Sequence, residues 1–238
     1  MIIFVKQKIK KMIFTINQKF EYLENLTQMV VNGITPSLIL VGEGGIGKSH
    51  TVKSVINSLD IPESNYTFIK GYSTARGLYN TLYDNNGKII IFDDCDSVLD
   101  DRVAVNILKS ALDSYDSRQI SWLAKMTKSD EYPNKFEFTG QIIFISNKKK
   151  SSIDEAILSR SLTVDLTMTP SEKIVRMKHI LPNILPNYQM DVKEDALNFL
   201  DQNKDKCQLN FRTLIMISKI RLAHPQNWRQ LATYMINS

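Results

Sequence analysis

The sequence is poor in the residues that stabilise disulfide-rich or zinc-bound domains. Its 238 residues include two cysteines, Cys95 and Cys207, too few for a disulfide framework or a cysteine-ligated zinc site. Its nine glycines and seven prolines exclude a collagen-like or low-complexity chain. No run of about 18 uncharged apolar residues is present, so we expect no membrane span and no membrane partner. These features predict a folded protein of the reducing cytoplasm.

The excess of positive charge, +5 in total, lies in a short N-terminal segment. Residues 1–20 contain no acidic residue and five lysines, which are Lys6, Lys8, Lys10, Lys11 and Lys19. The rest of the chain is therefore neutral, which argues against a basic nucleic-acid-binding face on the body. We interpret residues 1–17 as a basic N-terminal arm. Two alternatives stay open: an amphipathic contact segment, or a natural start at Met12.

Short apolar segments alternate with segments of helical periodicity up to residue 168. The expected strands are 37–41, 66–70, 88–92, 141–146 and 162–166, and the expected helices are 18–32, 48–59, 74–85 and 100–112. Apolar strands that alternate with helices are typical of a parallel sheet covered on both faces. Residues 18–168 are therefore predicted to form an α/β nucleotide-binding domain with a five-stranded parallel sheet.

Two regions depart from this alternation. Residues 113–140 are long for a loop, and polar and apolar residues alternate over 118–124 and 135–140, which predicts an inserted β-hairpin. After residue 169 the pattern is helical only, with helices expected at about 171–181, 193–202, 210–223 and 226–236. Residues 169–238 are therefore predicted to be a small all-helical lid domain.

The most specific motif is the glycine-rich segment GEGGIGKS at residues 42–49, which matches G-x-x-x-x-G-K-[ST]. Such a loop wraps a phosphate with its backbone N–H groups, and the helix that follows points its positive end at the anion. Lys48 is expected to reach the β- and γ-phosphates, and the Ser49 hydroxyl to bind Mg²⁺. The predicted nucleotide-binding residues are Gly42, Glu43, Gly44, Gly45, Ile46, Gly47, Lys48, Ser49 and His50.

A second motif places Asp93 and Asp94 directly after the apolar strand 88–92. A carboxylate at the end of a buried strand is how P-loop enzymes hold the Mg²⁺ shell, and Asp93 fits that role. Asp94 is expected to polarise the attacking water as the general base. The adjacent Cys95 is expected to be a small buried residue.

The order of these motifs resembles the AAA+ ATPase family over about residues 18–225. The resemblance implies that Asn147, which follows strand 141–146, orients the water or senses the γ-phosphate. Ser159-Arg160-Ser161 is similar to the Ser-Arg-Cys stretch of clamp-loader subunits, so Arg160 corresponds to an arginine finger. Arg212, in Asn210-Phe211-Arg212, corresponds to the family's lid arginine. Together with Lys48 and Asp94, these three residues form the implied catalytic set.

The resemblance implies hydrolysis of ATP with Mg²⁺ at the interfaces of a ring or spiral of like subunits. Helicase loaders, clamp loaders and small phage-encoded AAA+ proteins have similar motifs, which favours a role in DNA replication or recombination, with DNA or a DNA-bound protein as partner. Clamp-loader subunits continue into a helical collar that we do not find here, so we do not expect a conventional clamp-loader subunit.

Two alternative functions stay open. In an ATP-dependent protein remodeller, Tyr72 would grip a polypeptide, although a turn at Gly71 with a packed Tyr72 is the preferred interpretation. In an ATP-binding assembly switch, hydrolysis would be slow, because Asp94 stands where the family usually has glutamate.

We interpret Lys148-Lys149-Lys150 as a solvated turn rather than a contact to a phosphate backbone. The expected hairpin carries Trp122, Lys125 and Lys128 for insertion into a partner, or packs Trp122 on the body.

Overall fold

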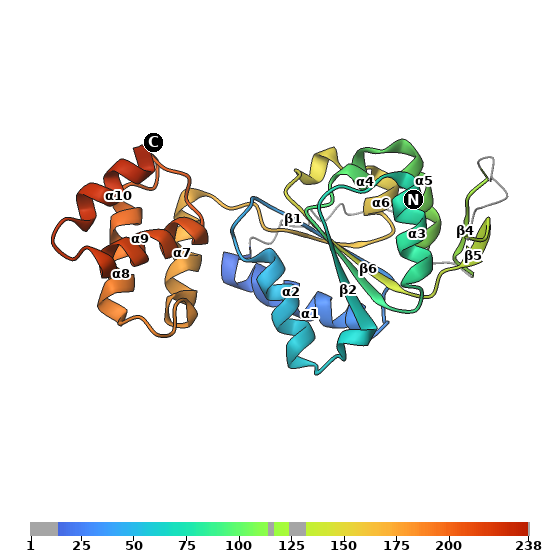
Figure 1. The fold of residues 1–238 in the computed structure, drawn as a ribbon, viewed down its shortest axis with the longest axis horizontal. Coiled ribbons are helices and arrows are strands. Elements are labelled where there is room, and N and C mark those ends of the chain that lie inside the picture. Colours follow the sequence, from blue (N-terminus) through green and yellow to red (C-terminus); the bar gives the residue numbers. More distant parts are fainter. Residues whose placement is uncertain (1–13, 114–116, 124–131, 238) are drawn as a thin grey trace, which may run out of the picture.

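The computed structural model describes residues 14–113, 117–123 and 132–237. Most of the expected basic arm, and Lys125 and Lys128, lie outside these residues. Figure 1 shows an α/β part, with a helical part beside it that follows in the chain. In the described part of the chain, no helix is both long and apolar enough to cross a membrane.

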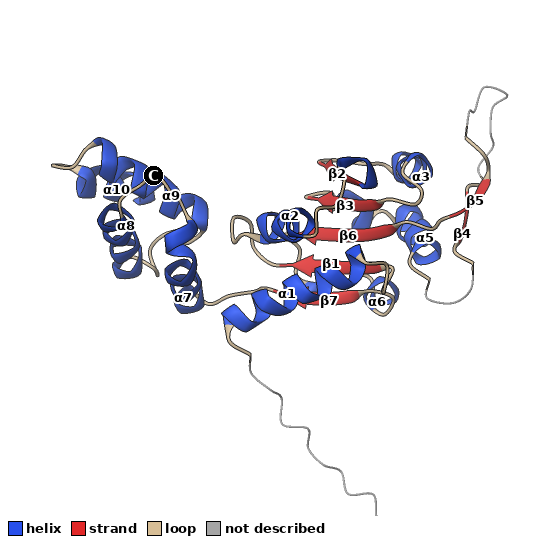
Figure 2. Cartoon of the chain, turned by 90° about the horizontal axis from the view of Figure 1, so that it is seen from below, coloured by secondary structure: helices blue, strands red, loops and turns tan. Residues whose placement is uncertain are grey.

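The α/β part is built on a five-stranded parallel sheet with the order β2-β3-β6-β1-β7 (Figure 2). The strands are β1 (Ser37–Val41), β2 (Tyr66–Lys70), β3 (Ile89–Asp93), β6 (Gln141–Ser146) and β7 (Leu162–Asp165). All five strands are parallel, so their carboxyl ends meet at one edge of the sheet. The sequence segments that follow β1, β3 and β6, including both chemical motifs, are therefore brought together there. This confirms the predicted fold class.

Helices cover both faces of the sheet. The elements α1 (Ile16–Val31) and α2 (Lys48–Ser58) share a hydrophobic cluster with Ile89 and Ile91 of β3. On the other face, α3 (Ala75–Asp84) and α5 (Arg102–Ala111) share a second cluster with Ile90 and Phe92. Successive residues of a strand point to opposite faces, so covering both faces explains why the strands are apolar throughout.

Local capping shifts the expected helix boundaries. Helix α1 begins at Ile16 rather than at residue 18, because Thr15 and Gln18 form a capping box. The helix expected over 100–112 is α5, which begins at Arg102 after a separate short helix, α4 (Ser97–Asp100). Asp101 caps α5 by accepting from the backbone N–H of Val103 at 2.7 Å. The short elements α6 (Glu155–Leu158), η1 (Glu63–Asn65) and η2 (Lys150–Ser152) are not among the predicted helices, because one turn leaves no periodicity.

The predicted hairpin is present and consists of β4 (Gln119–Ser121) and β5 (Lys135–Glu137), which pair antiparallel with Ile120 opposite Phe136. It projects from the end of the α/β part that lies away from the helical part (Figure 1). The Trp122 ring lies 5.9 Å from that of Tyr79. Of the two predictions for Trp122, packing on the body is the one observed.

The helical part consists of α7 (Pro170–Ile180), η3 (Leu181–Asn183), α8 (Met190–Gln202), α9 (Phe211–Ala223) and α10 (Trp228–Asn237). Helix α7 begins with a Thr169–Glu172 capping box and Pro170 in its first turn. These helices have a hydrophobic cluster of their own, with fully buried Met177 and Leu214. The helical part therefore has a core separate from that of the sheet.

Candidate nucleotide-binding site

The glycine-rich segment forms a loop between the end of β1 at Val41 and the start of α2 at Lys48. Gly47 has a φ of +95°, and a Cβ there would lie 2.9 Å from the Phe211 ring. Residues with a side chain rarely adopt this conformation, so glycine is required both for the backbone turn and for the close approach of α9. The loop leaves its N–H groups and the amino end of α2 available for a phosphate.

The ammonium of Lys48 lies at the centre of this loop. Its Nζ donates to the carbonyl oxygens of Gly42 and Glu43, each at 2.7 Å, and to Oδ1 of Asn147 at 2.8 Å. Burial lowers the pKa of Lys48 to about 8, although nearby carboxylates, Asp94 above all, oppose the shift. Lys48 is thus a poorly solvated cation whose hydrogen-bond partners here are neutral oxygens, which is an environment that favours an anionic ligand.

The Ser49 hydroxyl donates to Oδ1 of Asp93 at 2.7 Å. Asp93 is buried, and its other carboxylate oxygen pairs with Lys70 of β2 at 3.0 Å. In the described residues, no group of three or more acidic, histidine or cysteine side chains is placed to hold a metal ion. A hydroxyl and one carboxylate fit Mg²⁺, which proteins hold with one or two carboxylates, water and substrate phosphates.

Asp94 and Asn147 meet beside Lys48. Nδ2 of Asn147 donates to Oδ1 of Asp94 at 2.7 Å. The φ of Asp94 is +59°, a left-handed conformation uncommon for a residue with a side chain. Strain of this kind clusters at functional sites, and here it accompanies a carboxylate oriented by a neighbouring amide. No sequence pattern predicts this backbone conformation.

Cys95 follows the acidic pair and is buried, as expected. Burial and, after it, the carboxylates of Asp93, Asp94 and Asp96 raise the pKa of its thiol to about 11. The thiol is therefore protonated at neutral pH and acts as a packing residue.

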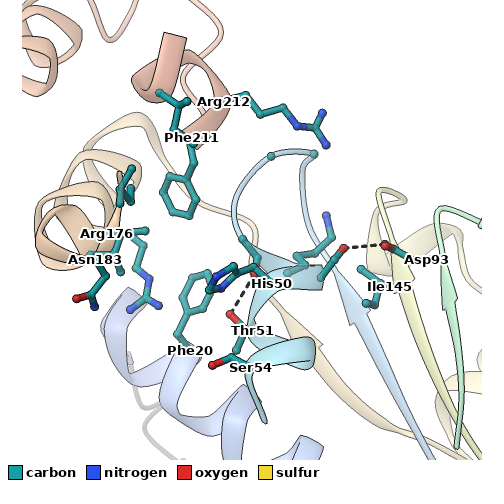
Figure 3. A pocket seen from close by; sticks show the side chains of 18 of the residues that line it. Phe20, His50, Thr51, Ser54, Asp93, Ile145, Arg176, Asn183, Phe211 and Arg212 are labelled. Atoms are coloured by element: carbon teal, nitrogen blue, oxygen red, sulfur yellow. Dashed lines mark hydrogen bonds between the residues drawn. The ribbon is translucent and has the colours of Figure 1, made fainter. Parts of the chain in front are cut away.

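A cavity of about 640 Å³ extends from the loop to the helical part (Figure 3). Its phosphate end is lined by Gly44, Gly45, Gly47, Lys48, Ser49, His50, Asp93, Asp94 and Asn147. Its other end is lined by residues that include Phe20 of α1, Arg176 of α7 and Phe211 of α9. The volume and mixed lining are typical of a small-molecule site. The sequence does not predict this second end, because its residues meet only when the helical part packs on α1.

The other predicted loop residues are placed differently. Ile46 is buried in the hydrophobic cluster of α1 and α2, and the Glu43 carboxylate faces Lys173 of α7. For these two residues, only the backbone is available to a phosphate. Arg212 reaches from α9 toward the loop and lines the cavity (Figure 3).

Arg160 lies apart from this cluster. Its carbonyl oxygen accepts a hydrogen bond from Ser37, the first residue of β1, at 3.3 Å, whereas the phosphate-binding loop follows the last residue of β1. A strand rises about 3.3 Å per residue, so these two ends of β1 are roughly 13 Å apart. Its Nη1 donates to the carbonyl oxygen of Ala156 at 2.9 Å, and its buried Nε has no hydrogen-bond partner among the described residues.

Two other predictions are tested by side-chain exposure. Tyr72 is 82% exposed, so its preferred interpretation as a packed residue was wrong. The preceding Gly71 has a φ of +90°, and no atom of the described residues would lie within 4 Å of a Cβ at this position, so the turn projects outward. Lys148 pairs with Asp100 at 2.7 Å, which leaves Lys149 and Lys150 as the exposed members of the lysine run.

Comparison with known proteins decides the family. Residues 38–166, more than half of the chain, match the "ATPase family associated with various cellular activities (AAA)". The chain belongs to the AAA family. The matched segment begins in β1 and ends just after β7, so it contains the phosphate-binding loop, the acidic pair, Asn147 and Arg160.

Other similarities extend beyond this segment. An uncharacterized 36.7 kDa protein of Enterobacteria phage T4, from the nrdC–mobD intergenic region, is 27% identical over 250 residues, which cover 96% of this chain and 77% of that protein. The Thermotoga maritima RuvB Holliday junction branch migration motor has a TM-score of 0.56 at 14% identity, with 93% of this chain and 68% of RuvB covered. A single-substitution variant of the same RuvB has a TM-score of 0.58 at 12% identity, with 93% and 69% covered. At these identities, the similarity to RuvB shows only that the two folds are alike, and the similarity extends to the helical part.

Proposed function

We propose that this AAA protein binds ATP with Mg²⁺ in the cavity beside Lys48 and hydrolyses it to ADP and phosphate. The observation that carries the proposal is the connected group at the carboxyl edge of the sheet. Lys48 contacts Asn147, Asn147 contacts Asp94, and Ser49 contacts Asp93, all at 2.7–2.8 Å. Membership of the AAA family supports the choice of reaction.

Each residue of the group has a distinct task in phosphoryl transfer. Lys48 exchanges its carbonyl partners for the β- and γ-phosphate oxygens. Asp94, held by Asn147, accepts a hydrogen bond from the attacking water and orients it. Ser49 and Asp93 would hold Mg²⁺, which supplies charge neutralisation between the phosphates. Donors and charges fixed in place before the reaction stabilise the developing charge without reorganisation.

We propose further that the active form is a ring or spiral of identical subunits. Arg160 lies at the amino end of β1, too far from its own loop to contact a nucleotide there. Its position at the opposite end of the sheet supports a role on the nucleotide of a neighbouring subunit. An arginine supplied in trans to a phosphoryl-transfer site raises kcat by about 10³- to 10⁵-fold in known systems.

We propose DNA, or a protein bound to DNA, as the macromolecule that is remodelled. The fold similarity to RuvB, a branch migration motor, supports this choice. The exposed Lys149 and Lys150 follow Asn147 and offer charge for a phosphate backbone. Binding through phosphates is strongly salt-dependent, so this proposal predicts an affinity that falls steeply with salt.

A second candidate is an ATP-dependent protein remodeller. The observation that favours it is Tyr72, which is 82% exposed and follows the carboxyl end of β2. An exposed aromatic ring can grip a polypeptide without regard to its sequence. In this case unfolded protein, rather than DNA, stimulates turnover, and Tyr72→Ala abolishes the stimulation while basal turnover is unchanged.

The test is ATP turnover against protein concentration, alone, with single-stranded DNA, with branched DNA and with an unfolded protein. Specific activity that rises with concentration and is stimulated by DNA supports both the oligomer and the DNA target. Stimulation by unfolded protein alone selects the second candidate. ATP binding without turnover under every condition contradicts hydrolysis and leaves an ATP-dependent assembly switch.

A further inference from the structure

An ion pair joins the phosphate-binding loop to the helical part. Nζ of Lys173, on α7, lies 2.5 Å from Oε2 of Glu43. The Lys173 side chain is 9% exposed and that of Glu43 is 54% exposed. The ammonium is thus the buried partner, and within the described residues Glu43 is the carboxylate that pairs with it. Removing the Glu43 carboxylate would therefore leave an uncompensated buried ammonium, which is strongly unfavourable.

Glu43 connects this ammonium to that of Lys48. The Glu43 backbone carbonyl accepts from Nζ of Lys48 at 2.7 Å, while its carboxylate binds Lys173. One residue of the loop therefore contacts both the lysine at the phosphate position and a lysine of the lid. Movement of the Glu43 peptide changes the geometry of both contacts.

A second contact holds α7 about one turn further along the helix. The guanidinium of Arg176 lies 3.8 Å from the centre of the Phe20 ring, and its Nη1 donates to Asn17 at 3.2 Å. A third contact is made by α9, where the backbone N–H of Phe211 donates to the Gly45 carbonyl at 2.9 Å. Phe20, Arg176 and Phe211 all line the cavity. The Glu43–Lys173 pair is the contact that joins α7 directly to the loop.

We infer that Glu43 and Lys173 form a latch that positions the helical lid over the nucleotide and reports occupation of the phosphate-binding loop to the lid. Both are positioning residues, because they act through Lys48 and through the placement of α7. The inference deepens the proposed function and rests on nucleotide binding in the cavity, but not on hydrolysis, oligomer formation or the identity of the target.

The latch works through the exchange of Lys48 partners. When phosphate oxygens take the Lys48 ammonium, the Glu43 carbonyl loses a charged donor and its peptide is free to turn. The carboxylate on the same residue then moves relative to Lys173, and α7 follows because its buried ammonium keeps its carboxylate partner. This route to the lid runs through the loop itself and is separate from Arg212 on α9.

The experiment measures lid protection and nucleotide affinity in the whole chain. Hydrogen exchange is recorded over residues 170–180 with and without ADP, and a fluorescent ADP is titrated. Glu43→Gln and Lys173→Met are each expected to speed exchange of α7 in the free protein. Each is expected to weaken ADP binding by about ten-fold, which lies within the usual range of coupling between sites. Lys178→Met, an exposed lysine on the same helix, is the matched control and leaves both readouts unchanged.

The double variant Glu43→Gln/Lys173→Met makes the test specific. If the residues act as one latch, the double variant is no worse than either single variant, because effects are not additive for residues in contact. In the charge-reversed pair Glu43→Lys/Lys173→Glu, restored lid protection supports the latch even if a single variant folds poorly. Additive losses, or α7 exchange that stays at the wild-type rate in both single variants, overturn the inference.

The same data separate failure of the latch from failure of the proposed function. If neither wild-type protein nor Lys48→Ala binds ADP, nucleotide binding itself is contradicted. If wild-type protein binds ADP and ADP changes α7 exchange equally in wild type and Glu43→Gln, only the latch is contradicted.

Discussion

The predicted catalytic residues at the two ends of the parallel sheet are held in different ways. At the carboxyl end, Lys48, Asp94 and Asn147 are linked to one another by short hydrogen bonds. At the amino end of β1, Arg160 has a buried Nε that is unpartnered among the described residues, and it lies apart from the other predicted catalytic residues. The side chains at the carboxyl end are held by one another, whereas Arg160 is too distant to serve the loop of its own subunit. This difference suggests that a complete site needs the amino end of a second copy.

The largest effect is expected from Arg160→Ala. Loss of an arginine that acts in trans lowers kcat by about 10³-fold or more, while ADP binding is retained because the carboxyl end is untouched. Steady-state turnover and ADP titration provide the measurement. Arg102→Ala, an exposed arginine of α5, is the control and keeps full turnover. If Arg160→Ala weakens ADP binding in dilute, monomeric protein, Arg160 acts on the nucleotide of its own subunit. The two ends of the sheet would then belong to one site.

A comparable or smaller loss of turnover is expected from Asp94→Asn. The amide keeps the size of the side chain but cannot polarise water, so kcat falls by about 10²- to 10⁴-fold and KM changes little. Asp94→Glu keeps the carboxylate and introduces the residue usual in the family, so it separates loss of the base from a change in side-chain length. If turnover of Asp94→Asn matches that of wild type, Asp94 is not the base.

The mildest effect is expected from pH. The pKa of Lys48 in the free protein is lowered to about 8, mainly by burial, and bound phosphates raise it again by supplying negative charge. Below pH 8 the ammonium is already charged, so Lys48 adds no pH dependence to the affinity. Above pH 8 binding must take up a proton, so the Kd for ADP rises by up to about ten-fold per pH unit. ADP titrations from pH 6 to 10 measure this rise. Lys48→Arg stays charged throughout and removes it, whereas a wild-type Kd that is unchanged to pH 10 contradicts the assignment.

Local features of the molecule could be predicted from the sequence. The bounds of β2 and β6 agree with prediction at both ends, because each is a largely apolar segment between polar residues. The phosphate-binding loop is equally local, since the spacing of its glycines, Lys48 and Ser49 alone predicts the roles of these two residues.

Features that depend on tertiary contacts could not be predicted. Glu43 and Lys173 are 130 residues apart, and neither carries a signal of its partner. The sequence places Phe20 on the buried face of α1, but the contact of Arg176 with the Phe20 ring arises only when α7 packs against α1. The exposure of Tyr72 and the left-handed backbone of Asp94 likewise arise from how neighbouring elements meet.

We propose that Arg160 of one subunit completes the site of another, and mixing two inactive variants tests this arrangement. Arg160→Ala and Lys48→Ala proteins are each expected to be nearly inactive, since one lacks the arginine and the other the phosphate-binding lysine. Mixed, they form interfaces at which an intact Arg160 faces an intact Lys48. We predict that the 1:1 mixture regains a substantial fraction of wild-type ATP turnover at concentrations that support assembly. A mixture no more active than the sum of its two components, under conditions where both proteins co-assemble, would show that Arg160 does not act on the nucleotide of a neighbouring subunit.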